Sequence, residues 1–128
     1  MIILNFSHPL TDAHLQSIAR LTKQEEVPQV IDLPVKFDSS QPFIPQLESL
    51  AQTLPLTSRE LQTLPILVNL PALNHIAALL IAYLHGVTGH FPSIIRLNPA
   101  PDSTPTVFEV AEIINLQSLR DETRSNYR

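Results

Sequence analysis

Twelve prolines divide this 128-residue chain into short segments, and they constrain the fold more than any other feature of the sequence. An average proline content of about 5% would give roughly half that number. Because proline fixes φ and has no N–H to donate, it is tolerated at the ends of helices and strands and disrupts their interiors. We therefore expect short elements that begin and end near prolines.

Five apolar, β-prone runs predict strands. The run at 65–70 is apolar apart from Asn69 and ends at Pro71, which is typical of a central strand covered on both faces. The run at 27–37 contains Pro28 and Pro34, which suit an edge position better than a central one. The predicted strands are residues 1–6, 27–37, 65–70, 91–97 and 107–114.

Capping residues and helical spacing of apolar residues predict the helices between these runs. Thr11 is placed to cap a first helix, and the sequence from Thr57 to Glu60 matches a capping box. Gly86 and Gly89 are placed to end the most apolar helix. A polar helix is expected near the C-terminus. The predicted helices are residues 11–23, 43–54, 57–64, 72–85 and 115–124.

The alternation of strands and helices predicts the fold class. Strands separated by helices form right-handed crossovers, which give a mainly parallel sheet with helices on both faces. The last strand follows its predecessor without a helix, so we expect it to be antiparallel and near an edge. The sequence thus predicts an α/β protein, a Rossmann-like three-layer sandwich of about five strands, as one domain over residues 1–128.

The rare residue types exclude several kinds of site. Glycine occurs twice, where average usage would give roughly nine, which excludes a Walker loop and the G-x-G-x-x-G turn. Cysteine is absent, which excludes disulfides, thiolate zinc sites and a cysteine nucleophile. No serine lies in a G-x-S-x-G elbow.

Charge and hydropathy restrict the partners. The net charge is −4 and no basic stripe is apparent, so we expect no binding of duplex nucleic acid. The longest apolar stretch, 76–84, is at most half of the roughly 20 residues that a membrane helix needs. No secretory signal is visible at the N-terminus. We expect a cytoplasmic protein without a membrane partner.

A candidate site follows from the expected topology. In open α/β sheets, ligands bind beyond the carboxyl ends of the strands, where the strand order reverses. In a flavodoxin-like order, the loops 5–9 and 69–72 meet there, and each leads into a helix N-terminus that attracts anions. The fourth strand ends on the same side. The sequence predicts a phosphate or nucleotide pocket formed by Asn5, Phe6, Ser7, His8, Asn69, Ala72, Arg96 and Asn98.

Structural alternatives exist for most of these residues. Asn5 and Asn69 could instead satisfy backbone groups at the strand ends. Ser7 is as compatible with an ordinary turn as with a ligand contact. Arg96 stands among apolar neighbours, so its charge needs a bound phosphate or a carboxylate partner. Glu109 and Glu112 on the next strand are the candidates for that partner.

The other histidines are better explained by packing than by metal binding. His85 and His90 are five residues apart, not the four that place two ligands on one helical face, and they belong to the opposite end of the sheet. We expect a helix-terminal or packing role for both. His14 and His75 lie on helices among apolar residues, and we expect partly buried structural roles. We expect no metal site.

Four blocks of the sequence resemble a family of small CRISPR-associated accessory proteins, the Csx-fifteen family. The blocks are residues 1–11, 64–69, 85–97 and 110–116, and the third contains Gly89-His90-Phe91-Pro92. The likeness spans nearly the whole chain. None of the blocks encodes a known catalytic signature, and the resemblance carries over no contact residues, so the site assignment rests on the strand-end argument.

The resemblance implies a role in type III CRISPR antiviral defence, in which cyclic oligoadenylates activate toxic effectors. It implies binding of such a ring, with cyclic tetra-adenylate favoured, to sequester it and dampen signalling without a cofactor. The two-fold symmetry of that ring suits a homodimer. Phe6 and Phe43 are candidates for stacking on adenine.

Two alternatives remain open. A metal-independent ring nuclease would use His8 as general acid or base and Arg96 to stabilise developing charge. A protein-interaction module would bind no nucleotide at all.

Overall fold

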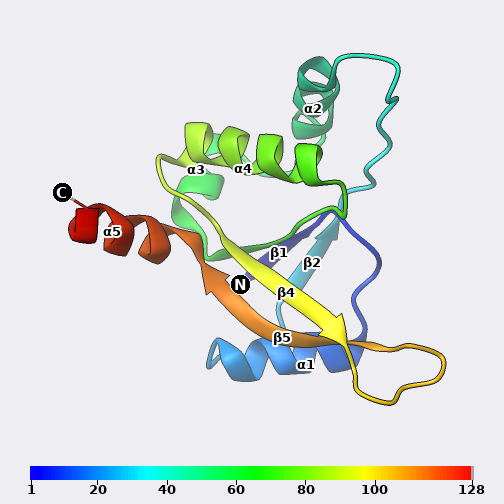
Figure 1. The fold of residues 1–128 in the computed structure, drawn as a ribbon. Coiled ribbons are helices and arrows are strands. Elements are labelled where there is room, and N and C mark those ends of the chain that lie inside the picture. The colour runs from blue at the N-terminus through cyan, green and yellow to red at the C-terminus, as the bar shows by residue number, and fades with distance from the viewer. Residues whose placement is uncertain (128) are drawn as a thin grey trace.

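A five-stranded sheet in the order β2-β1-β3-β4-β5 organises the computed structural model, which describes residues 1–127 (Figure 1). Neighbouring strands are parallel except β5, which is antiparallel to β4. The expected α/β class, the edge position of the second strand and the antiparallel last strand are confirmed. The strands are β1 (Ile2–Asn5), β2 (Gln29–Asp32), β3 (Ile66–Asn69), β4 (Ser93–Pro99) and β5 (Phe108–Asn115).

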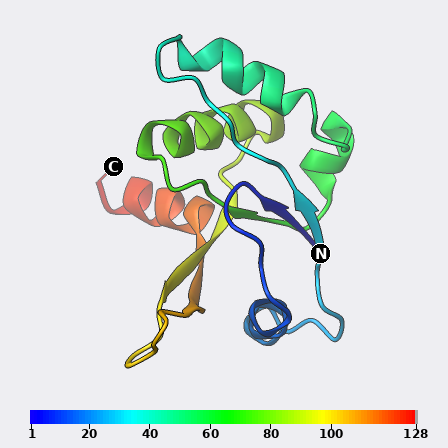
Figure 2. The same ribbon diagram turned by 90° about the vertical axis from the view of Figure 1, so that its right-hand side faces the viewer.

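Five helices accompany the sheet. Helix α1 covers one face, and α2, α3 and α4 lie on the other, which completes the three layers of a Rossmann-like sandwich (Figure 2). Helix α5 follows β5 directly and projects from the sheet (Figure 1). None of the helices within residues 1–127 has the length and apolar character needed to cross a bilayer. The helices are α1 (Asp12–Leu21), α2 (Phe43–Ala51), α3 (Ser58–Thr63), α4 (Asn74–Thr88) and α5 (Leu116–Tyr127).

The prolines lie at the ends of elements, as the sequence predicts. Pro65 precedes β3, and Pro42 is the N-cap residue of α2. The second strand is much shorter than the predicted 27–37, because β2 is confined between Pro28 and Pro34. Neither proline can donate a ladder hydrogen bond, so the strand cannot extend through them.

Of the two predicted stops of the helix expected over 72–85, the structure confirms Gly89 and contradicts Gly86. Helix α4 starts at Asn74 and continues through Gly86 to Thr88. A single glycine inside a helix costs only about 1 kcal/mol relative to alanine, so it does not end the helix. Gly89, the second predicted stop, ends the helix with φ at 81° and its N–H donating to the His85 carbonyl at 2.8 Å. This left-handed residue is the usual C-terminal stop.

Two hydrophobic cores lie on opposite faces of the sheet. Leu4 and Val68 face α4 and pack with Leu80 and Leu84, whereas Ile3 and Leu67 face α1. Successive side chains of a strand point to opposite faces, so a strand covered on both sides must be apolar at every position. This explains the continuous apolar runs that precede Asn5 in β1 and Asn69 in β3. The polar residues of these two strands, Asn5 and Asn69, are the last residue of each strand and lie at its carboxyl end.

Candidate functional site

Asn5 and Asn69 form a buried hydrogen-bonded pair at the carboxyl ends of β1 and β3. They are register partners, and the Asn69 Nδ2 donates to the Asn5 Oδ1 at 2.9 Å. The Asn5 Oδ1 also accepts from the Ser7 N–H at 3.1 Å. The Asn5 Nδ2 donates to the His8 carbonyl at 3.0 Å and to the Asp32 Oδ1 at 2.8 Å.

These contacts give Asn5 a structural role. Its amide oxygen and nitrogen are both occupied, and every buried side-chain nitrogen and oxygen among residues 1–127 has a hydrogen-bond partner. Asn5 therefore fixes the turn that follows β1, and Asn69 orients Asn5. Two interpretations of these asparagines were open. The structure favours the one in which they hydrogen-bond to groups at the strand ends over the one in which they bind a ligand.

The sequence did not single out Asp32, which is part of the same network. It ends β2 opposite Asn5, and its carboxylate accepts the Asn5 amide hydrogen bond. The only local signal was an acidic residue within a predicted edge strand. Its partner could be identified only from the register between β1 and β2.

A pocket of about 260 Å³ lies at this end of the sheet, on the side of α4. Phe6, Ser7 and His8 line it from the β1–α1 loop, together with Val35. The segment before α4 lines it from the other side, with Pro71, Ala72 and Leu73. The Phe6 side chain is buried in the core, whereas Ser7, His8 and Ala72 are exposed. The two loops therefore meet as the strand-end argument predicts.

The two helices that leave these loops differ at their N-termini. Helix α1 is closed by a reciprocal capping box, in which the Thr11 Oγ1 accepts from the His14 N–H and the Thr11 N–H donates to the His14 Nδ1. Helix α4 has Leu73 at its N-cap position, whose side chain has no oxygen to accept a hydrogen bond. Only α4 thus keeps an uncapped N-terminus at the pocket, which corrects the expectation that both helices would offer one.

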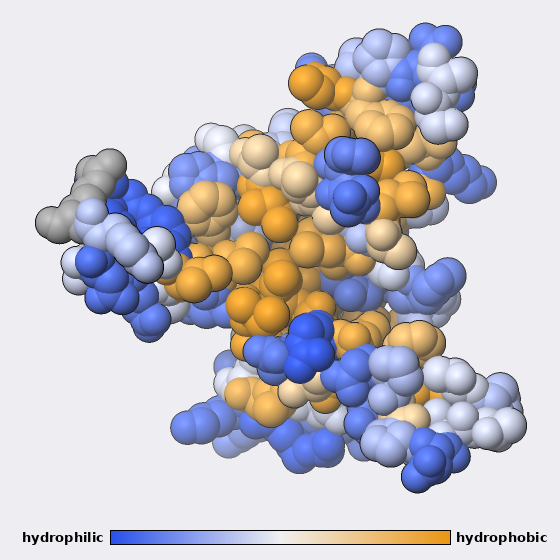
Figure 3. Space-filling model, viewed as in Figure 1, coloured by the Kyte–Doolittle hydropathy of each residue, from blue (hydrophilic) through white to orange (hydrophobic). Residues whose placement is uncertain are grey.

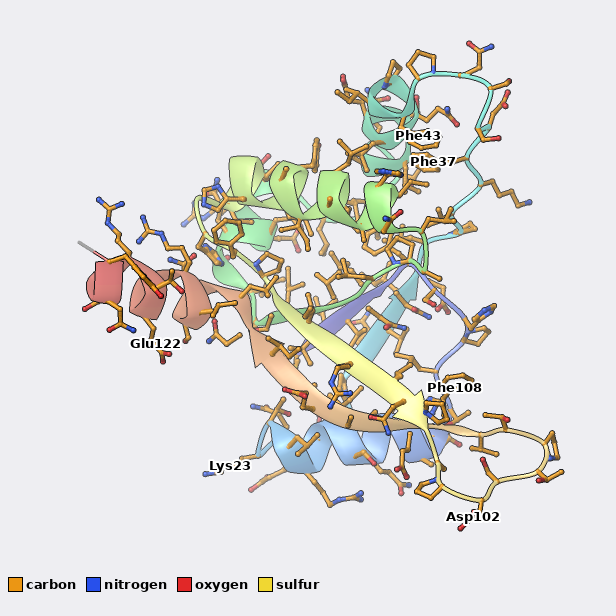
Figure 4. The ribbon with its side chains drawn as sticks, in the orientation of Figure 1. Lys23, Phe37, Phe43, Asp102, Phe108 and Glu122 are labelled. Atoms are coloured by element: carbon orange, nitrogen blue, oxygen red, sulfur yellow. The ribbon has the colours of Figure 1, made fainter. Side chains whose placement is uncertain are left out.

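His14 also joins α1 to β5. Its Nδ1 accepts from Thr11, so the proton resides on Nε2, which donates to the Phe108 carbonyl at 2.7 Å. Phe108 lies at the start of β5 beside the first turn of α1 (Figure 4). The expected partly buried, structural role of His14 is confirmed. The same expectation for His75 is wrong, because the buried face of α4 is formed by Ile76, Leu80 and Leu84, which leaves His75 exposed.

Arg96 and Asn98 do not line the pocket. The Arg96 Nη2 and Nε lie 2.6 and 2.7 Å from the Glu112 Oε2, and its Nη1 donates to the Asn98 Oδ1 at 3.2 Å. Both charged side chains are half exposed. The structure supports the alternative in which Arg96 pairs with a carboxylate. A phosphate would have to compete with Glu112 for the Arg96 guanidinium group.

A bulge decides which glutamate pairs with Arg96. The register between β4 and β5 shifts by one residue, so Arg96 lies opposite Glu112 while Leu97 lies opposite Val110. Ala111 is the extra residue. Glu112 and Glu109 are consequently on the same face of the sheet although they are three residues apart, and Glu109 lies opposite Asn98.

The other aromatic and histidine candidates are packed elsewhere. Phe43 belongs to α2 and packs edge-on against Phe37, with ring centroids 5.6 Å apart (Figure 4). The His85 ring packs on Phe91 with centroids 4.4 Å apart, at the amino ends of the strands. Phe6 is buried, and Phe43 does not line the pocket. Neither ring therefore presents a free face to an adenine there. Within residues 1–127, no three His, Asp or Glu side chains form a group that could hold a metal ion.

The predicted site residues thus separate into three groups. Asn5 and Asn69 form the buried network, and Arg96 and Asn98 form an ion-pair cluster with Glu112. The structure brings the remaining four together at the pocket: Phe6, Ser7, His8 and Ala72. Comparisons of the chain with protein-family models, curated proteins and solved structures found no match.

Proposed function

We propose that the protein binds cyclic oligoadenylate, with cyclic tetra-adenylate favoured, and sequesters it in type III CRISPR defence. The observation that carries the proposal is the position of the 260 Å³ pocket, where the order of the strands reverses and where α4 begins without a cap. Ligands of open α/β sheets bind at such a point. The resemblance to the Csx-fifteen family supplies the class of ligand, and the cytoplasm is where such a messenger acts.

The start of α4 supplies the attraction for a phosphate. The partial positive charge at a helix N-terminus and its free N–H groups favour an anion. One first-turn N–H, that of His75, donates to the Asn74 Oδ1 at 2.9 Å. Ser7 and His8 line the pocket opposite the segment before α4, and both residue types carry groups that can donate to a phosphate. These local donors act within a few ångströms, whereas the net charge of −4 is screened over about 8 Å at physiological salt.

The size of the pocket limits what one copy can hold. Pockets for drug-sized ligands measure about 300–1,000 Å³, so this pocket accommodates a phosphate and part of one nucleotide. A ring with two-fold symmetry can place one such group in each of two pockets when two copies share it. The proposal therefore includes a homodimer.

Binding is favoured over cleavage by the chemistry of the lining. His8 is the one titratable side chain among the residues that line the pocket. Arg96, the partner that cleavage would need to stabilise developing charge, is held by Glu112 on another part of the sheet. A single general acid or base without that partner lacks half of the proposed nuclease machinery.

The test is calorimetric titration of the purified protein with cyclic tetra-adenylate in the absence of metal, followed by chromatography of the recovered ligand. The exposed Ala72 in the pocket is replaced by glutamate, and Ala13→Glu on the exposed side of α1 is the matched control. A carboxylate within about 5 Å of a phosphate repels it by more than 1.4 kcal/mol at an effective dielectric constant of 20. We expect Ala72→Glu to weaken binding at least about tenfold and Ala13→Glu to leave it unchanged.

Three outcomes would contradict the proposal. Linear products formed over many turnovers would identify a ring nuclease. A wild-type protein that binds neither cyclic tri-, tetra- nor hexa-adenylate would remove the nucleotide function. Equal affinities of Ala72→Glu and Ala13→Glu would place the ligand at a different site.

A further inference from the structure

The tip of the loop between β1 and α1 is held at the pocket by polar contacts. Ser7, His8 and Pro9 are exposed, and Figure 3 shows hydrophilic surface at this loop beside the apolar surface over the middle of the molecule. Within residues 1–127, Ser7 and His8 make two hydrogen bonds, and both go to the Asn5 side chain. The Ser7 N–H donates to the Asn5 Oδ1 at 3.1 Å, and the Asn5 Nδ2 donates to the His8 carbonyl at 3.0 Å. The Asn5 side chain therefore determines where these two residues lie.

The orientation of the Asn5 amide matters because its two ends differ in chemistry and hardly in shape. Its oxygen faces a donor at Ser7, and its nitrogen faces an acceptor at His8. An amide turned end for end would set donor against donor at Ser7 and acceptor against acceptor at His8, so both hydrogen bonds would be lost. A group that fixes the orientation of the amide therefore also fixes the loop.

Asp32 is such a group. Its Oδ1 accepts from the Asn5 Nδ2 at 2.8 Å. A carboxylate can only accept, so it stabilises the nitrogen end of the amide at this position, and its charge strengthens the hydrogen bond. Asn69 is itself an amide and can turn together with Asn5. In the part of the chain that the structure describes, the Asp32 carboxylate makes no other hydrogen bond and no ion pair.

We infer that Asp32 is a positioning residue for ligand binding, although it does not line the pocket. Through Asn5, its carboxylate holds Ser7 and His8 in the arrangement that the ligand meets. The inference rests on the proposed function and deepens it, because it adds to that site a residue of the edge strand β2. A loop that is in the binding arrangement for only a fraction of the time binds with an affinity reduced by that fraction.

The charge of Asp32 and its hydrogen bond act on an anionic ligand in opposite directions. The Asp32 Oδ1 and the His8 carbonyl oxygen are both bonded to the Asn5 Nδ2, so the carboxylate lies close to the loop. A negative charge there repels a phosphate, and its removal alone should strengthen binding. Loss of the acceptor should weaken binding, because it releases the amide. The sign of the change in affinity thus separates positioning from simple electrostatics.

The test compares the full-length wild type with three variants, by calorimetric titration with cyclic tetra-adenylate and by NMR without nucleotide. Asp32→Leu removes the acceptor and the charge but keeps a side chain of similar size. Asp32→Asn removes the charge and keeps an acceptor oxygen. Gln29→Leu is the matched control, because Gln29 is an exposed polar residue at the amino end of the same strand.

We expect Asp32→Leu to bind cyclic tetra-adenylate at least about fivefold more weakly than the wild type, which corresponds to a loop in the binding arrangement about a fifth of the time. Asp32→Asn should bind at least as tightly as the wild type, and Gln29→Leu should bind equally. In the NMR spectrum, the signal of the Ser7 backbone amide should move in Asp32→Leu and stay close to its wild-type position in the other two variants. A general loss of stability would not move that one signal.

Asp32→Leu is expected to fold, because Asp32 is exposed and Asn5 keeps the His8 carbonyl as an acceptor. Circular dichroism checks this, and Asp32→Ala carries the same expectations if the leucine variant does not fold. An affinity of the leucine variant equal to or above that of the wild type would overturn the inference. An equal loss of affinity in Asp32→Asn or in Gln29→Leu would overturn it as well, because the acceptor at residue 32 would then not be the cause.

The NMR measurement separates this inference from the proposed function. A wild type that binds no cyclic oligoadenylate, with a Ser7 signal that moves in Asp32→Leu, would refute the proposed function and support the hold of Asp32 on the loop. A wild type that binds the ring, with a Ser7 signal that does not move in Asp32→Leu, would support the proposed function and overturn the positioning role.

Discussion

The Asn69 side chain donates a hydrogen bond to the Asn5 side chain across β3 and β1, and both residues are almost completely buried. Through Asn5 this bond reaches the Ser7 N–H, the His8 carbonyl and the Asp32 carboxylate. One amide side chain thus connects the ends of three strands to the loop that lines the pocket. The geometry of that loop depends on an amide, which both donates and accepts.

Asn5→Asp is expected to destabilise the protein even though the two side chains have nearly the same shape. The new carboxylate would place an oxygen where the Asn5 Nδ2 now donates, next to the Asp32 Oδ1 and the His8 carbonyl. We expect a loss of at least about 3 kcal/mol at neutral pH, measured by chemical denaturation. Asn126→Asp on the exposed side of α5 is the control and should change stability little.

The same variant has an expected pH dependence. Two adjacent carboxylates raise the pKa of one of them, so folding of Asn5→Asp binds a proton. Its stability deficit should therefore be largest at neutral pH and shrink as the pH falls through that raised pKa. A deficit that is constant between neutral and mildly acidic pH would contradict the placement of Asp32 beside Asn5.

His14→Ala is expected to cost about 1–2 kcal/mol of stability. The change removes one half of the capping box of α1 and the hydrogen bond from the His14 Nε2 to the Phe108 carbonyl. His75→Ala makes the same replacement in the first turn of α4, where the side chain is exposed, and should change stability by less than about 0.5 kcal/mol. Thermal unfolding of both variants checks this, and equal effects would contradict the role of His14.

Alanine at the two glycines should have opposite effects. Gly86 lies inside α4 with nothing within 4 Å of an added Cβ, so Gly86→Ala should stabilise the protein by about 0.5–1 kcal/mol. Gly89 has a φ of 81°, so Gly89→Ala should destabilise it by about 1 kcal/mol. Both variants are measured by urea denaturation at one protein concentration. The same sign for both would show that α4 does not continue through Gly86.

Arg96→Ala is expected to have a small effect on stability and on ligand affinity. Its ion pair with Glu112 is half exposed, and exposed pairs contribute about 0–1 kcal/mol. A double-mutant cycle with Glu112→Ala measures the coupling, and Glu109→Ala is the control because Glu109 lies opposite Asn98. A tenfold loss of affinity for cyclic tetra-adenylate in Arg96→Ala would show that the binding site extends from the pocket onto β4.

Ser40→Ala is expected to change the titration of Asp38. The Ser40 hydroxyl and N–H both donate to the Asp38 carboxylate and lower its pKa below the ordinary value. A lowered pKa means that this contribution to stability is present above the unfolded value and is lost as the pH falls through the folded one. The variant should raise the Asp38 pKa toward 3.8, as measured by NMR titration of the carboxyl carbon. An unchanged pKa would exclude the Ser40 hydroxyl as the main cause, because the N–H of residue 40 is retained in the variant.

Local sequence patterns predicted the elements well and their ends less well. The apolar run at 65–70 and the capping box at Thr57 correspond to β3 and α3. Of the two glycines that predict the end of α4, Gly89 ends the helix and Gly86 does not, because the conformation of a residue, and not only its identity, ends a helix. The second strand was predicted too long because apolar residues continue past Pro34 into a segment without ladder hydrogen bonds.

The pocket loops could be predicted because topology alone places them. Parallel strands end at the same edge of a sheet, so the segments after β1 and β3 had to meet. The partner of Arg96 could only be narrowed to two glutamates, because the bulge at Ala111 determines the pairing. A one-residue shift in register moves every later side chain to the other face, and nothing local in the sequence reveals it.

The α/β class, the strands covered on both faces and the loops that form the pocket can all be predicted from the sequence. Periodicity and proline positions are patterns over a few residues and need no knowledge of the packed fold. The tertiary structure alone decided that Asn5 binds Asp32 and Asn69 and that Arg96 pairs with Glu112. These features depend on contacts between residues far apart in the chain, which only the packed fold brings together.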